Sequence, residues 1–202
     1  MKTKLVIATN NKDKFREINA ILKETLGSRL KIISLSDFNI PPVIEDGKTL
    51  KENAVKKANE VSRATGLITL AEDTGLEVDY LNGEPGVYSA RYAGPGKSYS
   101  DNNKKLLSKL KGIPFEKRTA QFRCVAAIVF PDGDIQTAEG IIKGTLTDKE
   151  RGTAGFGYDP VFLVPEYNKT FAELPLETKN KISHRSKAIH LAALKILEML
   201  KK

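Results

Sequence analysis

Apolar residues along the chain switch between short continuous runs and helical spacing, and this pattern predicts an α/β fold. Residues 4–9 form a β-branched and aliphatic run with the length of a buried strand. A helix is expected next, ending at Gly27, because apolar side chains recur three or four positions apart at Phe15, Ile18, Ile21, Leu22 and Leu26. A second strand is expected at residues 30–34.

The clearest helical pattern covers residues 49–65. Thr49 and Glu52 have the spacing of a capping box, and Gly66 is suited to end the helix. One face is apolar at Leu50, Ala54, Ala58 and Val61. A further strand is expected at residues 67–71, ending where the polar segment Glu72-Asp73-Thr74-Gly75 begins.

The second half of the chain predicts a hairpin between two helices. Ser100 is expected to cap a helix that ends near Gly112. Residues 119–130 and 135–146 read as two strands around a Pro-Asp-Gly-Asp turn, which is a strong hairpin signal. A glycine-rich loop leads into another strand within residues 155–164. Ser183 is expected to cap a last helix, with inward positions at Ala188, Leu191, Ala192 and Ile196. Strand–helix alternation followed by a hairpin predicts a mixed sheet.

Size and composition are those of one globular domain, which we expect to span residues 1–202. Hydrophobic residues make up 40% of the chain and charged residues 29%, enough for a core and a soluble surface. No apolar run reaches the ~18 residues of a membrane span, and the N-terminal apolar run is too short for a signal peptide. Cys124 is the only cysteine and is expected to be an inert core thiol. These features predict a cytoplasmic protein without a membrane partner.

The net charge of +8 indicates an anionic partner, and nucleic acid, acidic lipid and nucleotides all fit it. A single-stranded nucleic-acid surface needs aromatic side chains among the basic ones. Aromatic residues are only 7% of the chain and tryptophan is absent. A nucleic-acid-binding module is therefore the weaker alternative, and no stable nucleic-acid partner is expected.

The turn after the first predicted strand could bind an anion. It contains Thr9, Asn10, Asn11 and Lys14 and opens a helix, where free backbone N–H groups and the helix dipole favour negative charge. The turn lacks the glycines of a P-loop. Taken alone, it is equally a polar turn with surface lysines.

Glu72 and Asp73 could form a metal site, because carboxylates after a buried strand are costly unless they meet cations or water. Glu45 could add a third carboxylate, and a hard divalent cation prefers such oxygen ligands. The alternative is an acidic turn without a ligand.

Two later segments could contact the base of a nucleotide. In Gly155-Phe156-Gly157-Tyr158-Asp159-Pro160, the glycines permit close approach and the aromatic rings could stack. Ser183-His184-Arg185-Ser186 could meet an anion or a carbonyl group at a helix start. A tight turn with core aromatics is the alternative for the first.

Taken in order, these segments closely resemble the inosine triphosphate pyrophosphatase family, the non-canonical purine NTP pyrophosphatases, over essentially the whole chain. The matching motifs are Thr9-x-Asn11-x-x-Lys14-x-x-Glu17, Glu52-Asn53-Ala54, Asp73-Thr74-Gly75-Leu76, Pro85-Gly86-Val87-Tyr88-Ser89-Ala90-Arg91, Gly155-Phe156-Gly157-Tyr158-Asp159-Pro160 and Ser183-His184-Arg185.

The resemblance implies an elongated mixed sheet flanked by helices, with two lobes and an active-site cleft between them, in a homodimer. It implies Mg²⁺-dependent hydrolysis of ITP, dITP and XTP to a monophosphate and pyrophosphate. By motif, Asp73 would be the general base of the reaction and a metal neighbour, and Glu45 would be a metal ligand. The substrate-binding residues would be Thr9, Asn10, Asn11 and Lys14 at the triphosphate, Thr74, and Phe156, Gly157, Tyr158, Asp159, Lys179, His184 and Arg185 around the base and sugar.

Two positions depart from the family pattern. Many relatives have Asp at the position of Glu72 and Gly at the position of Asn10. The longer Glu72 puts its part in a metal site in doubt, whereas asparagine tolerates positive φ and would preserve the turn. A pyrophosphatase for modified pyrimidine nucleotides is the alternative enzyme.

Overall fold

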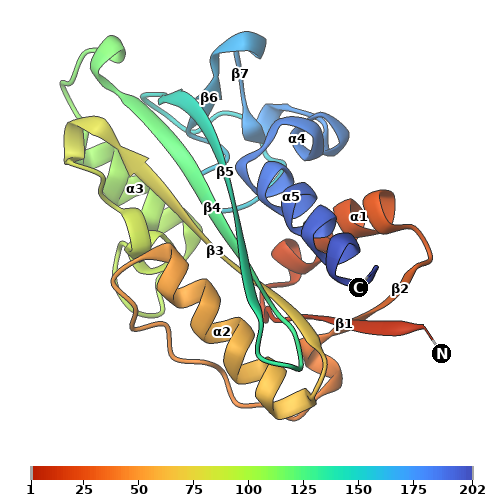
Figure 1. The fold of residues 1–202 in the computed structure, drawn as a ribbon. Coiled ribbons are helices and arrows are strands. Elements are labelled where there is room, and N and C mark those ends of the chain that lie inside the picture. Colours follow the sequence, from red (N-terminus) through yellow and green to blue (C-terminus); the bar gives the residue numbers. More distant parts are fainter. Residues whose placement is uncertain (1, 202) are drawn as a thin grey trace. The chain divides into compact units, whose positions relative to one another are not determined.

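The computed structural model describes residues 2–201 of the chain and contains a seven-stranded mixed sheet with helices (Figure 1). The strand order is β2-β1-β3-β4-β5-β6-β7. The strands are β1 (Thr3–Ile7), β2 (Leu30–Ser34), β3 (Ile68–Val78), β4 (Thr119–Val129), β5 (Ile135–Leu146), β6 (Phe162–Val164) and β7 (Lys169–Thr170). The main helices are α1 (Lys12–Leu26), α2 (Leu50–Thr65), α3 (Tyr99–Lys109), α4 (Leu176–Ile182) and α5 (His184–Met199).

Strand directions change along the sheet. β1 pairs in parallel with β2 and with β3, whereas β6 is antiparallel to both β5 and β7. The parallel part is connected through α1 and α2, as parallel strands require a crossover. This arrangement confirms the predicted mixed α/β fold.

The chain divides into two compact units, each with its own apolar core. Unit 1 comprises the residues up to Asp73, Cys124–Gly140, and those from His184 onward; unit 2 comprises Thr74–Arg123 and Ile141–Ser183. In unit 1, α1 and α5 pack against each other over a core that includes Ile18 and Ile189. A single domain over residues 1–202 stays a prediction.

The start of α5 lies directly on strand β5 within unit 1. Gly140 has no side chain at this contact, and a Cβ atom there would collide with the carbonyl oxygen of His184 and the backbone nitrogen of Ala188. The close approach fixes the first turn of α5, which carries Arg185.

Local sequence signals placed several elements correctly. β2 has the predicted bounds, α1 ends at Leu26 with Gly27 as its C-cap, and β4 and β5 form the predicted strands on either side of the Pro131–Asp134 turn. Cys124 is fully buried, as expected of a core thiol.

The prediction that a strand ends at Ala71 is wrong, because β3 continues to Val78. The apolar pattern resumes at Leu76 and Val78, which are fully buried. Glu72 and Asp73 therefore lie inside a strand, where partners described below compensate their burial.

Three finer predictions also need correction. Ser98, not Ser100, caps α3, since the Ser98 hydroxyl accepts from the backbone of Asp101 and the Asp101 carboxylate accepts from the backbone of Ser98. Thr49 does cap α2, but the Glu52 carboxylate accepts from the backbone of Lys48 and does not complete a capping box. On α5, Leu191 is 47% exposed, because the buried face turns toward Ile189 and Ala193.

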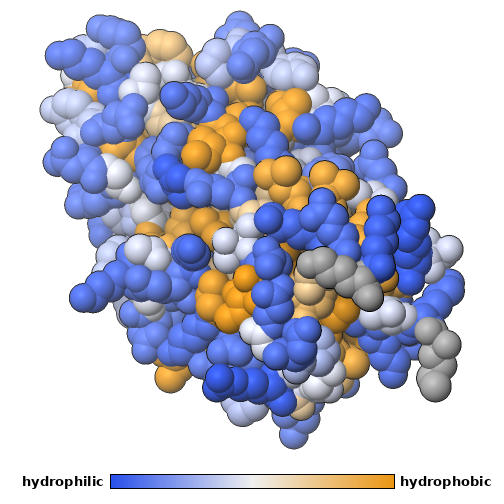
Figure 2. Space-filling view, viewed as in Figure 1, coloured by the Kyte–Doolittle hydropathy of each residue, from blue (hydrophilic) through white to orange (hydrophobic). Residues whose placement is uncertain are grey.

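Hydrophilic side chains cover most of the face shown in Figure 2, with apolar side chains scattered between them. Within residues 2–201, no helix has the length and hydrophobicity that a bilayer span needs.

Candidate active site

The turn between β1 and α1 is organised by its own side chains. The Asn11 side-chain oxygen accepts from the backbone N–H groups of Asp13 at 3.0 Å and Lys14 at 3.1 Å, which makes Asn11 the N-cap of α1. The Thr9 hydroxyl accepts from the backbone of Asn11 at 3.2 Å. Asn10 is exposed and has an ordinary negative φ, so the structure does not use its tolerance of the left-handed region.

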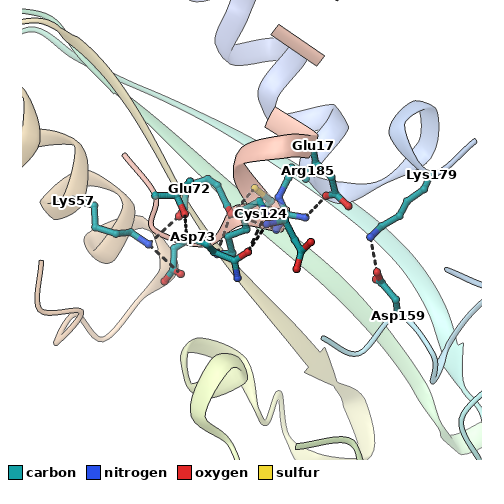
Figure 3. A network of polar contacts seen from close by, with 12 residues as sticks. Glu17, Lys57, Glu72, Asp73, Cys124, Asp159, Lys179 and Arg185 are labelled. Atoms are coloured by element: carbon teal, nitrogen blue, oxygen red, sulfur yellow. Dashed lines mark hydrogen bonds and ion pairs between the residues drawn. The ribbon is translucent and has the colours of Figure 1, made fainter. Parts of the chain in front are cut away.

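Glu72 lies at the centre of a buried ion-pair network in unit 1 (Figure 3). Its carboxylate is fully buried and accepts from Lys14 Nζ at 2.9 Å and from Arg185 Nη2 at 3.3 Å. The Cys124 thiol contacts the other carboxylate oxygen at 3.3 Å. Two cations offset the cost of burying this carboxylate in a strand. The partners of the Glu72 carboxylate therefore include two cationic side chains and a thiol.

Arg185 is the second hub of the network. Its Nη1 atom donates to Glu17 at 2.7 Å, and the whole side chain is buried. Burial opposes the charged guanidinium, but the carboxylates of Glu72 and Glu17 outweigh it and raise the pKa of Arg185. Arg185 was predicted beside the base and sugar, whereas the structure commits both of its terminal nitrogens to carboxylates.

Asp73 follows Glu72 on β3 and has a different environment. Its carboxylate accepts from Asn53 Nδ2 at 3.1 Å and lies 3.6 Å from Lys57 Nζ. Burial raises the pKa of Asp73, and the nearby ammonium groups of Lys57 and Lys14 only partly oppose this shift. A carboxyl group with a raised pKa is a stronger base than an ordinary aspartate, which suits proton abstraction near neutral pH.

Glu45 and Asp73 share a cation, which tests whether they fit a metal ion. Lys57 Nζ lies 2.8 Å from Glu45 and 2.9 Å from the backbone carbonyl oxygen of Glu72, besides its contact with Asp73. These oxygens therefore converge on one positive charge, and Figure 3 shows Lys57 beside Glu72 and Asp73. Within the described residues, no three His, Cys, Asp or Glu side chains form a metal cluster. Two carboxylates fit Mg²⁺, which commonly takes its other ligands from phosphate and water.

The glycine-rich loop and Lys179 form a second polar group, in unit 2. Asp159 Oδ2 accepts from Lys179 Nζ at 2.5 Å (Figure 3). It also accepts from the backbone of Phe156 at 2.8 Å. Both charged side chains are buried. Lys179 Nζ also lies 5.0 Å from the centroid of the Phe156 ring. Asp159 therefore closes the loop and holds the ammonium group against an aromatic ring.

Tyr158 and Thr74 take no part in the ion pair between Asp159 and Lys179. The Tyr158 hydroxyl donates to the Ser89 backbone carbonyl at 2.9 Å, and burial raises the pKa of this phenol. This buried ring packs within unit 2. Thr74 is half-buried and follows Asp73 directly on β3.

The structure brings the predicted residues together in two groups. Lys14, Glu72, Asp73, Arg185 and Glu45 belong to one network in unit 1, and Phe156, Asp159 and Lys179 form the other group in unit 2.

Sequence reasoning assigned no roles to Glu17, Asn53 and Lys57. Glu17 and Asn53 stood inside motifs that were recognised. Lys57 had one local signal, because it follows Asn53 by four residues and shares its helix face.

Comparison with known proteins identifies the family. The family model described as the Ham1 family matches residues 5–194. A dITP/XTP pyrophosphatase of Geobacter sulfurreducens is 54% identical over 190 residues, covering 94% of each chain, and one of Desulforamulus reducens is 52% identical, covering 98% of this chain and 96% of the relative. The solved Ham1 protein of Staphylococcus aureus shares 40% identity with a TM-score of 0.86, covering 98% of this chain and all of that one. A HAM1 protein of Coxiella burnetii shares 35% identity with a TM-score of 0.88, covering 97% and 99%. The chain belongs to the Ham1 family.

Proposed function

We propose that the protein hydrolyses the non-canonical purine nucleoside triphosphates ITP, dITP and XTP to a monophosphate and pyrophosphate. Relatives about half identical to this chain carry the name dITP/XTP pyrophosphatase. The observation that carries the proposal is the network of unit 1. Glu72 accepts from Lys14 through its carboxylate and from Lys57 through its backbone carbonyl, and Lys57 also contacts the Glu45 and Asp73 carboxylates. Binding of a triphosphate needs a positive charge such as that of Lys14, and metal-assisted hydrolysis needs carboxylates such as those of Glu45 and Asp73.

The residues of unit 1 divide the work of phosphoanhydride hydrolysis. Asp73 orients a water molecule and takes its proton as the water oxygen bonds to the α-phosphorus, and pyrophosphate leaves. The hydrogen bond from Asn53 keeps the Asp73 carboxylate in place. Lys14 and the N-terminus of α1 offset the charge of the triphosphate. Glu45 and Asp73 would hold Mg²⁺, which supplies further positive charge to the phosphate oxygens when bound.

We assign recognition of the base to the group in unit 2. A purine stacked on Phe156 would be held without regard to its substituents. The Lys179 ammonium group can only donate hydrogen bonds, so it suits the C6 carbonyl of hypoxanthine or xanthine and not the C6 amine of adenine. Arg185 is left out of this group, because its ion pairs make it part of the network of unit 1.

Assembly as a homodimer and a cytoplasmic location complete the proposal. Both rest on the resemblance of the motifs. Light scattering of the purified protein should give twice the chain mass of 22.3 kDa.

Product analysis tests the proposed chemistry. Purified protein, incubated with ITP and Mg²⁺, should release inosine monophosphate and pyrophosphate in equal amounts. Removal of the metal with EDTA should stop turnover, and added Mg²⁺ should restore it. Orthophosphate and the diphosphate as first products would show cleavage at the wrong bond and refute the proposal.

Lys14→Ala should raise the KM for ITP at least about tenfold. The Lys14 side chain is 19% exposed and pairs with the fully buried Glu72 carboxylate at the start of α1. A charged hydrogen bond to phosphate contributes about 1.5–3 kcal/mol, and its loss gives a tenfold change or more. Steady-state kinetics with ITP measure the effect.

Lys12→Ala is the matched control, because Lys12 begins the same helix and its side chain is not part of the network. Unchanged KM and kcat in Lys14→Ala would mean that Lys14 serves only Glu72. Since Arg185 still pairs with Glu72 in this variant, the fold should survive.

A further inference from the structure

We propose that helix α3 positions the loop that reads the purine base, with Asn103 as the positioning residue and Tyr99 as its aromatic support. The base loop is defined here as residues 155–159. This inference deepens the proposed function and rests on it for the identity of the ligand. All of the residues involved belong to unit 2.

Asn103 connects α3 to the base loop through its side-chain amide. The Nδ2 atom donates to the backbone carbonyl of Gly157 at 3.2 Å and to Glu150 Oε1 at 2.8 Å. Both partners are acceptors, so they fix the orientation of the amide. The side chain is 2% exposed, and its Oδ1 atom is buried without a hydrogen-bond partner. A buried amide oxygen without a hydrogen bond costs free energy, and the two hydrogen bonds donated by the amide nitrogen offset that cost.

Tyr99 lies one turn before Asn103 on the same face of α3. Its ring centroid is 6.0 Å from that of Phe156, with the planes tilted by 42°. This distance and tilt are those of a favourable aromatic pair. Tyr99 is 40% exposed, so it contacts Phe156 from a position at the surface of the unit. One helix face therefore touches two successive residues of the loop.

The base loop needs such support because its backbone is permissive. Gly155 has a φ of +73° and Gly157 a φ of +64°, and each is free of the limits that a side chain imposes. The loop holds Phe156 internally through Asp159, which accepts from its backbone N–H group. Asn103 supplies the contact at Gly157 from outside the loop. Without the Asn103 contact, the Phe156 ring would no longer be held in a fixed position relative to the Asp159–Lys179 pair.

Asn103→Asp tests the proposal at nearly constant side-chain volume. The new carboxylate faces the Glu150 carboxylate and the Gly157 carbonyl, so two donated hydrogen bonds become repulsive contacts. We expect the KM for ITP to rise about tenfold, with kcat reduced less than about threefold. The inhibition constant of tripolyphosphate, which has no base, should stay unchanged. Amide hydrogen exchange at residues 156–158 should accelerate in the protein without nucleotide.

Leu106→Ala is the matched control, since Leu106 is fully buried in the core of unit 2 on the same helix. It should lower the Tm without raising the KM for ITP. If Asn103→Asp lowers the Tm in the same way but leaves both the KM and the loop exchange unchanged, Asn103 is merely structural and the proposal is wrong.

The two hypotheses fail in different ways. A wild-type protein that releases no pyrophosphate from ITP refutes the proposed function, whatever the variants do. Faster exchange at residues 156–158 in Asn103→Asp would still support a positioning contact, because that measurement needs no nucleotide. Slow exchange together with normal turnover of ITP by the variant would refute only the role of α3.

Discussion

Asp73→Asn should lower kcat for ITP by at least about 10²-fold while the protein stays folded. General-base removal typically costs ~10²–10⁴-fold, and loss of a metal contact adds to it. The amide is nearly isosteric with the carboxylate, and its oxygen can still accept from Asn53. Burial raises the pKa of Asp73, so the folded protein tolerates a neutral group there better than a charged one. Stability above the ordinary aspartate pKa should therefore not fall.

Single-turnover kinetics with ITP, together with urea unfolding, measure both parts of this prediction. Asp46→Asn is the control, because Asp46 is an exposed carboxylate that follows Glu45 in the sequence and pairs with Lys56 at 2.6 Å. It should retain normal turnover. A folded Asp73→Asn variant with more than about a tenth of the wild-type kcat would show that another group activates the water.

Arg185→Ala should destabilise the protein by about 3–5 kcal/mol, which is the usual result of breaking a buried ion pair from one side. The guanidinium group is fully buried and compensates both Glu17 and Glu72. Lys14 still pairs with Glu72 in the variant, whereas Glu17 loses the partner that it has at 2.7 Å. The free energy of unfolding in urea measures the loss.

The double variant Glu17→Gln with Arg185→Met separates charge from packing. It removes the charge of Glu17 together with that of Arg185 and fills part of the space of the guanidinium group with apolar atoms. It should recover a large part of the stability that Arg185→Ala loses. If Arg185→Ala unfolds at the wild-type urea midpoint, the buried network does not stabilise the fold, and this prediction is wrong.

Local sequence patterns predicted the elements whose causes are local. The helix that ends at Gly27 and the hairpin from residue 119 to residue 146 follow from apolar spacing and turn residues within a few positions. The end of β3 failed for the opposite reason. Whether a strand can contain Glu72 depends on Lys14 and Arg185, which come from distant parts of the chain. No window of local sequence contains that information.

The candidate site also combines residues that local motifs predict with contacts that depend on distant parts of the chain. Its carboxylates and Lys14 were predicted because their residue types stand together in recognisable motifs. Lys179 was placed near the base by resemblance alone, and its buried contact with Asp159 spans twenty positions of sequence. Arg185 was expected at the purine base, and the structure shows in addition its pairing with Glu17 across 168 positions of sequence. Pairing between distant charges decides these roles, and it appears only in the folded chain.

Substrate discrimination by the wild-type protein tests the central claim most directly. Pyrophosphate release should be followed under identical Mg²⁺ concentrations with ITP, XTP, ATP and a pyrimidine triphosphate. A donor that pairs with the C6 carbonyl is left unsatisfied by the adenine amine, and sites built on such hydrogen bonds can discriminate by several powers of ten. We predict a kcat/KM for ITP and XTP at least ~10²-fold above that for ATP. Equal values for ATP and ITP, or a preference for the pyrimidine nucleotide, would contradict the account.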